Sequence, residues 1–306
     1  MASAPWDPTQ LPSQAGKTFV VTGGNAGIGY FVSEQLAEAG GRIVLASRSQ
    51  EKADAAAASI RSRVPSAEVE FVRLDLSSLG TVREAASKIR GIGDIDVLIN
   101  NAGATTGSSK RQTTEDGLEF VVGSNAFGPY ALTALAFPAL KPDGRVVSLG
   151  SMATRLVKLD AANLQSTTGR YNFFRAYGYS KHAMHAFAFE LQRKLTASGS
   201  RIESILAHPG SAVDLRSAKR PGINDGGVKA LDVLSAVISQ GKDRGAWPVV
   251  RAAIDPDAKG GEFYGPKRSV TGAPVLLEPV ESSASEEFGA QFWRDAEAAT
   301  GITFEP

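Results

Sequence analysis

Short apolar runs alternate with longer segments of helical periodicity along most of the chain. The runs are rich in Val, Ile and Leu and read TFVVTG, RIVLAS, EVEFVRLD, DVLINNAG, RVVSLGS and RIESILAHPG, with a shorter late run, GEFYGP. Between them lie segments such as GIGYFVSEQLAEAG and SLGTVREAASKIRG, which have apolar residues at helical spacing and end near Gly. Strands that are apolar throughout are typical of a parallel sheet with helices on both faces. The pattern predicts an α/β fold with a doubly wound, Rossmann-like parallel sheet.

The alternation also predicts how the chain is divided. No linker rich in Gly, Ser or Pro interrupts it, so we expect an N-terminal arm over residues 1–15 and a single domain over residues 16–306. Residues 152–175 separate a strand from its helix by more than an ordinary loop, and insertions of this length are often functional. Residues 260–306 are expected to form a C-terminal extension that ends in the helical pattern EEFGAQFWRDAEAATG.

Composition narrows the classes of function. The 306 residues include 33 Lys and Arg and 32 Asp and Glu, a net charge of +1 that gives no basic surface for nucleic acid or an anionic membrane. The chain has no Cys, which excludes disulfides, thiolate nucleophiles and Cys-ligated zinc. The N-terminus lacks the pattern of a signal peptide, and Gly, Thr and Pro interrupt the apolar stretch AFGPYALTALAFPAL. We therefore expect a cytoplasmic protein without a membrane span.

The first predicted strand runs into the glycine-rich stretch TGGNAGIG, Thr22–Gly29, which leads directly into a helix. Glycines allow a tight turn and a close approach of the backbone to phosphates, and the N–H groups of a helix N-terminus favour a pyrophosphate. A plain turn would also use glycines, but the place between first strand and first helix favours a dinucleotide. The loop residues expected to contact it are Gly23, Asn25, Ala26, Gly27, Ile28 and Gly29.

The second predicted strand ends at Ser47 and Arg48. A cofactor with a free ribose 2′-hydroxyl would favour an acidic residue at this place. Arginine instead forms charge-assisted hydrogen bonds with a phosphate, although an arginine that simply faces water would look the same in the sequence. These two residues favour NADP(H) as the cofactor, with NAD(H) as the second choice.

A tyrosine and a lysine occupy stacked helical positions in AYGYSKHAMHAF, residues 176–187. At 3.6 residues per turn Tyr177 and Lys181 share a face, whereas Tyr179 points elsewhere. A nearby ammonium favours the phenolate and lowers the pKa of a tyrosine, which makes proton exchange with a substrate oxygen feasible. An ordinary amphipathic helix would also fit. His182 and His185 share a face as well, but no third ligand lies beside them, so we expect no metal site.

Together these motifs resemble the short-chain dehydrogenases/reductases, and within them the retinol-dehydrogenase-like branch. The resemblance rests on TGGNAGIG, LDLSS, NNAG, Tyr177-x-x-x-Lys181 and HPG, which occur in this order over about residues 16–210. It implies a Rossmann-like NADP(H)-dependent oxidoreductase that interconverts a carbonyl group and an alcohol on a fairly apolar small molecule. Family members often form a homodimer or a homotetramer through the helices that bear Asn125 and Tyr177. A long C-terminal tail that covered this surface would prevent such an assembly, so both outcomes stay open.

The resemblance implies a role for each matching residue. Tyr177 would be the general acid or base, and Lys181 would lower its pKa and hold the nicotinamide ribose. Ser151 would stabilise the charge that develops on the substrate oxygen, and Asn125 would hold a water for proton relay. The further cofactor contacts that it implies are Asp75, Leu76, Asn101, Ala102, Gly103, Pro209 and Gly210.

Two features depart from the family pattern. Asp214 stands where many members carry a Thr that contacts the nicotinamide carboxamide, and an ionised carboxylate accepts hydrogen bonds but cannot donate them. Tyr177 also follows Ser151 by more residues than is usual, because of the insertion at 152–175.

Three aromatic residues of that insertion, Tyr171, Phe173 and Phe174, are expected to shape an apolar pocket, although packing onto the core would also explain them. A non-catalytic NADP-binding sensor is the alternative function. The set Asn125, Ser151, Tyr177 and Lys181 argues against it, because a sensor has no need of groups that transfer protons.

Overall fold

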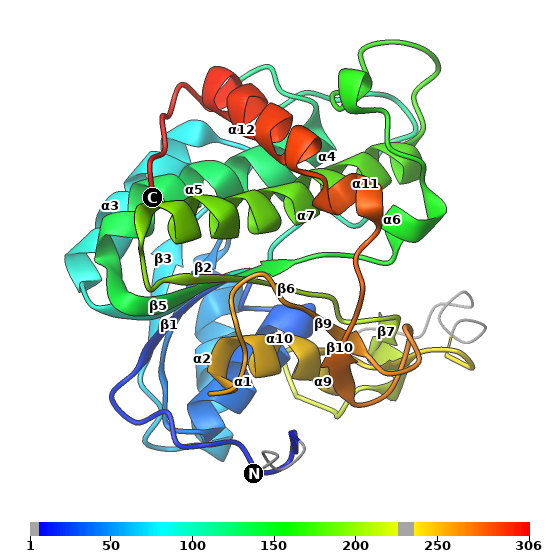
Figure 1. Cartoon of the computed structure of the whole chain (residues 1–306). Coiled ribbons are helices and arrows are strands. Elements are labelled where there is room, and N and C mark those ends of the chain that lie inside the picture. The colour runs from blue at the N-terminus through cyan, green and yellow to red at the C-terminus, as the bar shows by residue number, and fades with distance from the viewer. Residues whose placement is uncertain (1–5, 226–235) are drawn as a thin grey trace.

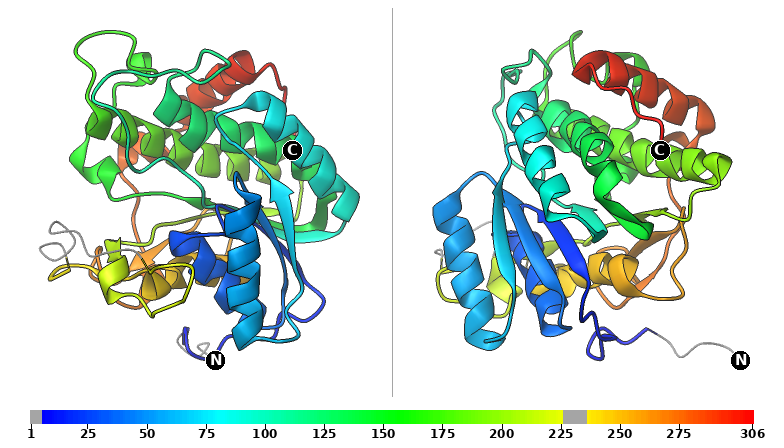
Figure 2. Two further views of the ribbon diagram at one scale, coloured as in Figure 1. Left: turned by 180° about the vertical axis from the view of Figure 1, so that it is seen from behind. Right: turned by 90° about the vertical axis from the view of Figure 1, so that its left-hand side faces the viewer.

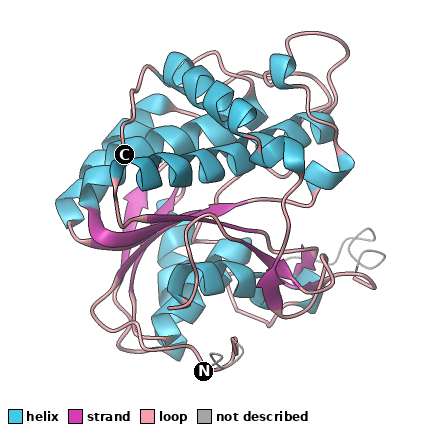
Figure 3. Ribbon diagram, in the orientation of Figure 1, coloured by secondary structure: helices cyan, strands magenta, loops and turns pink. Residues whose placement is uncertain are grey.

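The computed structural model describes residues 6–225 and 236–306, so residues 1–5 of the expected N-terminal arm lie outside it (Figure 1). An eight-stranded sheet crosses the centre of the molecule in the order β10-β9-β6-β5-β4-β1-β2-β3 (Figure 3). All neighbours in it are parallel except β9 and β10. The strands are β1 (Thr18–Thr22), β2 (Arg42–Ser47), β3 (Val69–Arg73), β4 (Ile95–Asn100), β5 (Leu140–Leu149), β6 (Glu203–Ala207), β9 (Phe263–Pro266) and β10 (Pro274–Leu276).

Helices cover both faces of this sheet, which confirms the predicted doubly wound fold (Figures 1 and 2). One layer consists of α1 (Gly27–Glu38), α2 (Gln50–Arg63) and α10 (Trp247–Ile254). The other consists of α3 (Leu79–Ile92), α5 (Gly128–Ala136), α7 (Phe173–Ser198) and α12 (Glu286–Thr300). Shorter elements are α4 (Phe120–Val122), η1 (Gly123–Phe127), η2 (Phe137–Ala139), α6 (Ala153–Leu156), η3 (Ala161–Asn163), β7 (Ala212–Val213), η4 (Asp214–Arg216), β8 (Gln240–Gly241), α9 (Lys242–Gly245) and α11 (Glu281–Ala284).

Burial on both sides explains the apolar runs of the sequence. Every residue of β1 is buried, and so are all residues of β2 after Arg42. The order of the strands reverses between β1 and β4, because β2 and β3 lie on one side of β1 while β4, β5 and β6 lie on the other. In an open α/β sheet such a reversal leaves a crevice at the carboxyl ends of the strands. The glycine-rich loop after β1 lies at this crevice.

The C-terminal segment is more than a helical extension. Residues 260–306 first supply β9 and the antiparallel edge strand β10 to the main sheet, and only then form α12. The insertion at 152–175 likewise ends earlier than expected, since α7 already begins at Phe173. The three-residue strand β10 is too short to leave a periodic signal in the sequence.

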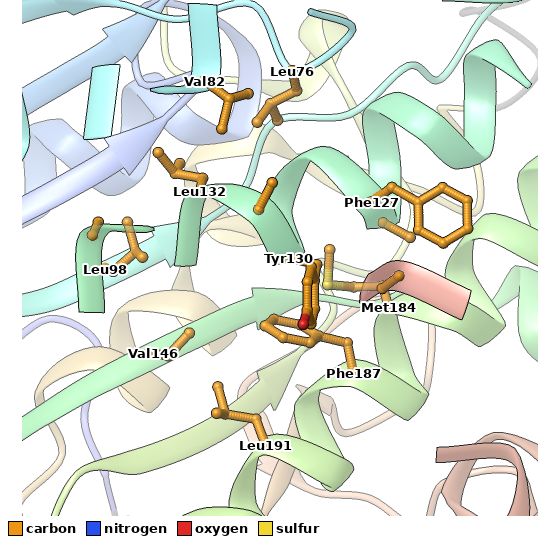
Figure 4. Packing of buried hydrophobic residues seen from close by; sticks show 14 of the residues in the cluster. Leu76, Val82, Leu98, Phe127, Tyr130, Leu132, Val146, Met184, Phe187 and Leu191 are labelled. Carbon is orange, nitrogen blue, oxygen red and sulfur yellow. The ribbon is translucent and has the colours of Figure 1, made fainter. Parts of the chain in front are cut away.

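Helix α12 packs along α7 and closes the upper half of the core (Figure 1). Phe292 stacks on Phe127 at 5.8 Å between ring centroids, and Trp293 meets Tyr130 edge-on at 5.2 Å. Below these rings Tyr130 and Phe187 continue into the aliphatic core over the sheet (Figure 4). Edge-on and stacked aromatic pairs add to the free energy gained from burial. The α12 helix is therefore part of the hydrophobic core.

One continuous helix, Phe120–Ala139, is long and apolar enough to cross a membrane by length and composition alone. Most of its most apolar window, 78%, is buried inside the protein. Core helices pass the same criterion, so this property does not distinguish a span from a helix of the core.

Truncating α12 at its centre tests this packing. Phe292 is fully buried, so Phe292→Ala should lower the free energy of unfolding by about 3–5 kcal/mol. The matched control is Phe174→Ala, because Phe174 is 50% exposed and its loss should cost less than about 1 kcal/mol. Urea unfolding followed by circular dichroism measures both. Equal losses in the two variants would contradict a core role for α12.

Candidate functional site

The glycine-rich loop turns from β1 into α1 through two residues with positive φ, Gly23 at +66° and Gly27 at +58°. A side chain at Gly29 would collide with the Gly23 carbonyl, so the loop can close only around glycine. Asn25 and Ile28 are half-buried, and Ala26 at the tip is exposed. The loop thus presents backbone to the crevice, as the sequence predicts for phosphate binding.

The N-terminus of α1 is free to bind an anion. Its N-cap residue, Ala26, has no side chain that can accept from the first backbone N–H groups. Five other helices of the described chain have a capping side chain, from Ser49, Ser78, Glu119, Asn172 and Ser285 respectively. Uncapped N–H groups at the reversal point of the sheet fit the pyrophosphate of a dinucleotide.

Side chains at the ends of β3 and β4 brace this crevice. Asn101 donates from Nδ2 to the Thr22 carbonyl at 2.7 Å, and the backbone N–H of Ala102 donates to Thr22 Oγ1 at 2.9 Å. Asp75 Oδ1 accepts from the Ser77 hydroxyl at 2.7 Å. These groups hold the loops together. Leu76 points its side chain into the core, so a cofactor contact there would have to come from its backbone (Figure 4).

A basic hollow lies beside the predicted adenosine end of the crevice. Arg48 lines a hollow of about 510 Å³ together with Gln50, Phe71, Arg73 and Lys88. Ser47 pairs in register with Arg73 on the neighbouring strand, which brings the two arginines to adjacent strand ends. The sequence analysis did not identify Arg73 and Lys88 as cofactor contacts. For Arg73 the available signal was that an arginine stands at the end of each of two successive strands.

Ser151, Tyr177 and Lys181 meet at the end of β5. Helical spacing predicts that Tyr177 and Lys181 are neighbours, and the family resemblance implies that Ser151 joins them. The Tyr177 side chain hydrogen-bonds with the Ser151 side chain. One turn later Lys181 donates from Nζ to the Leu149 carbonyl at 2.8 Å, and its Nζ lies 5.8 Å from the centroid of the Tyr177 ring. A phenol, a hydroxyl and an ammonium group are therefore gathered beside the crevice.

Burial dominates the electrostatics of this group. It raises the pKa of Tyr177, while the hydrogen bond from Ser151 lowers it. Burial lowers the pKa of Lys181 to about 8, which leaves its ammonium group mostly charged at pH 7. The lowering of the Tyr177 pKa that we expected from Lys181 is absent, because the ammonium lies over the ring face and donates to a backbone carbonyl.

Asn125 lies in a π-helical turn, Gly123–Phe127, within the helix that runs from Phe120 to Ala136. Such turns occur often at functional sites. Asn125 Oδ1 accepts from the Ala104 N–H at 2.6 Å, and its Nδ2 donates to the Ala104 carbonyl at 3.1 Å and to Ser180 Oγ at 3.0 Å. Its side chain thus ties the loop after β4 to α7. The water-holding role stays a prediction.

Two buried histidines hold the loops on either side of the site, which sequence reasoning missed. His185 Nε2 accepts from the Ser151 N–H at 3.3 Å, and His208 Nδ1 accepts from the Gly210 N–H at 3.0 Å. Both rings pack on Phe263, at 5.2 Å and 5.5 Å between centroids. Their positions within AYGYSKHAMHAF and HPG were the available signal.

The loop after β6 carries the other predicted contacts. Gly210 has φ +72° and a Cβ there would collide with the Val270 carbonyl, while the Pro209 carbonyl accepts from Gln240 Nε2 at 3.0 Å. Asp214 pairs with Lys242 at 2.6 Å between Oδ2 and Nζ. The carboxylate that departs from the family pattern at position 214 is therefore paired with a lysine.

A cleft of about 1130 Å³, lined by aromatic, aliphatic and cationic side chains, opens beside Phe173, the neighbour of Tyr177. Tyr171, Phe173 and Phe174 all line it, as expected from the insertion. The Phe173 ring stacks on that of Tyr177 at 6.4 Å between centroids, which connects the cleft to the phenol. Its other lining residues are Gly107, Ser108, Ser109, Leu156, Val157, Lys158, Arg170, Asn172 and Arg175.

Comparison with known proteins decides the family. The family model described as short chain dehydrogenase matches residues 17–219. The chain belongs to the short-chain dehydrogenases/reductases. Polyprenol dehydrogenase of Mus musculus is 33% identical to this short-chain dehydrogenase/reductase over 313 residues, 96% of this chain and 87% of the relative. Retinol dehydrogenase 13 of Homo sapiens is 33% identical over 302 residues, 95% and 87%.

A solved structure of an uncharacterized protein from Mycobacterium Paratuberculosis has a TM-score of 0.80 and 33% identity to this short-chain dehydrogenase/reductase, and covers 98% of both chains. The relatives place the chain in the retinol-dehydrogenase-like branch. It is an oxidoreductase that acts on CH–OH and C=O groups of a small molecule with a nicotinamide cofactor.

The buried histidines predict a loss of stability in acid. Burial and Arg155 lower the pKa of His208 to about 4, and burial with nearby His182, Lys181 and His208 lowers that of His185 well below 6.5. The unfolded chain takes up these protons near pH 6.5 and the folded chain only at lower pH. The free energy of unfolding should therefore fall as the pH drops below 6.5, by about 2–3 kcal/mol for His208 alone by pH 4.5.

His208→Asn checks this assignment, because Asn Oδ1 can accept from the Gly210 N–H but does not titrate. Urea unfolding at pH 7 and pH 4.5 should show a difference between the two pH values that is smaller in the variant by about 2–3 kcal/mol. An unchanged difference would show that His208 does not cause the acid sensitivity.

Proposed function

We propose that the protein is an NADP(H)-dependent oxidoreductase that interconverts a ketone or aldehyde and an alcohol on a fairly apolar small molecule. One observation carries the proposal: the hydrogen-bonded Tyr177 and Ser151, with the Lys181 ammonium beside them, lie at the carboxyl end of β5, and Phe173 connects Tyr177 to the cleft. A cytoplasmic location and a homodimeric or homotetrameric assembly remain predictions from the sequence.

The chemistry divides between cofactor and protein. When bound, the nicotinamide supplies or accepts a hydride, and the protein orients the reactants and moves a proton. In reduction Tyr177 Oη gives its proton to the substrate oxygen, and in oxidation it takes that proton back. Ser151 Oγ donates a hydrogen bond to the same oxygen and stabilises its developing negative charge. Lys181, whose Nζ lies 5.8 Å from the centroid of the Tyr177 ring, would hold the nicotinamide ribose when the cofactor is bound.

The cofactor preference rests on the basic hollow. The described chain gives Arg48, Arg73 and Lys88 no acidic partner, although ten ion pairs occur elsewhere in it. Arg48 follows the strand end where the ribose 2′-position of a dinucleotide is recognised. We infer that these cations bind a 2′-phosphate and so favour NADP(H) over NAD(H).

The cleft supports an apolar substrate. Aromatic and aliphatic side chains form much of its lining, and Phe173 connects it to Tyr177. The named relatives include a polyprenol dehydrogenase and a retinol dehydrogenase. A ketone, aldehyde or alcohol with a hydrocarbon body would fit such a cleft.

Removing the phenol oxygen tests the role of Tyr177. Tyr177→Phe should lower kcat for carbonyl reduction by about 10²–10⁴-fold, while the Kd for NADPH changes little. Tyr179→Phe is the matched control, since Tyr179 is buried two residues along the same helix and should keep full activity. NADPH oxidation at 340 nm over a panel of apolar ketones and aldehydes measures both. Full turnover by Tyr177→Phe would refute the role, and NADPH binding without any wild-type turnover would favour the sensor.

Removing the Arg48 guanidinium tests the cofactor preference. Arg48→Ala should raise the Kd for NADPH by about 10–100-fold and leave that for NADH nearly unchanged, because only NADPH carries the 2′-phosphate. Arg42→Ala is the control at the opposite end of β2, where the guanidinium pairs with Glu70. Fluorescence titration with both cofactors gives the Kd values. Equal weakening for NADPH and NADH would contradict the assignment.

A further inference from the structure

The ion pair between Asp214 and Lys242 is built by the small sheet of β7 and β8. Val213 and Gly241 are register partners, and Asp214 and Lys242 directly follow them. Lys242 Nζ and Asp214 Oδ2 are 2.6 Å apart, with 22% and 50% of the two side chains exposed. An ion pair this exposed contributes little to stability. Its position in the fold, rather than its contribution to stability, points to a function.

Lys242 lies directly over the glycine loop. A Cβ at Gly27, the first residue of α1, would lie 4.0 Å from Lys242 Nζ. Helix α9, which begins at Lys242, is fixed to α1 by a hydrogen bond of 2.8 Å from Gln35 Nε2 to the Asp243 carbonyl. A positive charge is thereby held beside the uncapped N–H groups that fit a pyrophosphate.

We propose that Lys242 binds the pyrophosphate of the cofactor and that Asp214 competes for the same ammonium group. The pair opens when the cofactor binds, because a pyrophosphate offers more negative charge and more acceptor oxygens than one carboxylate. Asp214 thus weakens cofactor binding, and Lys242 strengthens it. The proposal rests on the proposed function only in that NADP(H) occupies the glycine loop.

The two partners therefore have opposite effects, which separates this role from a structural one. A pair that merely held β7 and β8 in place would weaken binding when either side chain was neutralised. Competition predicts that Lys242→Gln raises the Kd for NADPH by about 5–20-fold and that Asp214→Asn lowers it by about 2–5-fold. In the double variant the benefit of Asp214→Asn should vanish, because the ammonium that it frees is gone.

The choice of ligand identifies the group that Lys242 contacts. NADPH, NADH and ADP-ribose share the pyrophosphate, so Lys242→Gln should raise the Kd of all three by a similar factor. Neutralising a contact with the 2′-phosphate would affect NADPH alone. A contact with the nicotinamide would leave ADP-ribose unaffected, and either selective result would overturn the proposal.

Fluorescence titration or calorimetry with the full chain gives these Kd values without any turnover. The Kd values therefore test the role of Lys242 even when no substrate of the enzyme is known. Lys141→Gln is the matched control: Lys141 also pairs with an aspartate, Asp96 at 3.0 Å, but at the amino ends of β4 and β5, and its Kd values should match wild type. Should Lys242→Gln fail to fold, weaker NADPH binding by Asp214→Asn alone would overturn the competition.

Discussion

A buried ammonium group determines how α7 lies on the sheet. Lys181 is 6% exposed and donates to the Leu149 carbonyl at 2.8 Å, at the end of β5. Burying a charge is costly unless hydrogen bonds stabilise it, so this contact defines the register between helix and strand. One turn earlier on α7, the register places Tyr177 against Ser151. The geometry of the proposed proton transfer depends on this one contact.

The loops around that contact are held by side chains that accept from backbone N–H groups. His185 holds Ser151, His208 holds Gly210, and Asn125 holds Ala104. Buried backbone groups need partners, and loops at a crevice have no neighbouring strand to supply them. His185 and Asn125 come from other elements of the fold, whereas His208 belongs to the same loop as Gly210. The crevice is therefore shaped before a ligand arrives, which reduces the cost of ordering it on binding.

Much of this architecture could be predicted from the sequence because it depends on local patterns. Apolar runs gave seven strands of the main sheet, glycine spacing gave the loop, and helical spacing gave Tyr177 beside Lys181. The antiparallel strand β10 was not predicted, because three residues are too few to show an alternating or continuous apolar pattern. The proposed binding roles of Arg73 and Lys242 were not predicted, because they depend on the strands and loops beside which the two residues lie. A single sequence does not show such neighbours.

The direction of the Tyr177 pKa shift could not be predicted from the sequence either. Spacing correctly placed a lysine one turn away, but the direction of its ammonium and the desolvation of the phenol depend on tertiary packing. Leu76 is similar, since the motif implies a cofactor contact at this position while its side chain belongs to the core. Chemistry that depends on residue type and spacing was predictable, and chemistry that depends on orientation was not.

Transfer of deuterium from the cofactor to a carbonyl compound would show hydride transfer by this protein without any inference from the structure. The wild-type protein would be incubated with NADPH deuterated at nicotinamide C4, in either configuration, and a panel of apolar ketones and aldehydes, and the products analysed by mass spectrometry. We expect an alcohol that carries one deuterium on the former carbonyl carbon, from one of the two C4 configurations only. Tight NADPH binding without labelled alcohol from any member of the panel would contradict the proposed function.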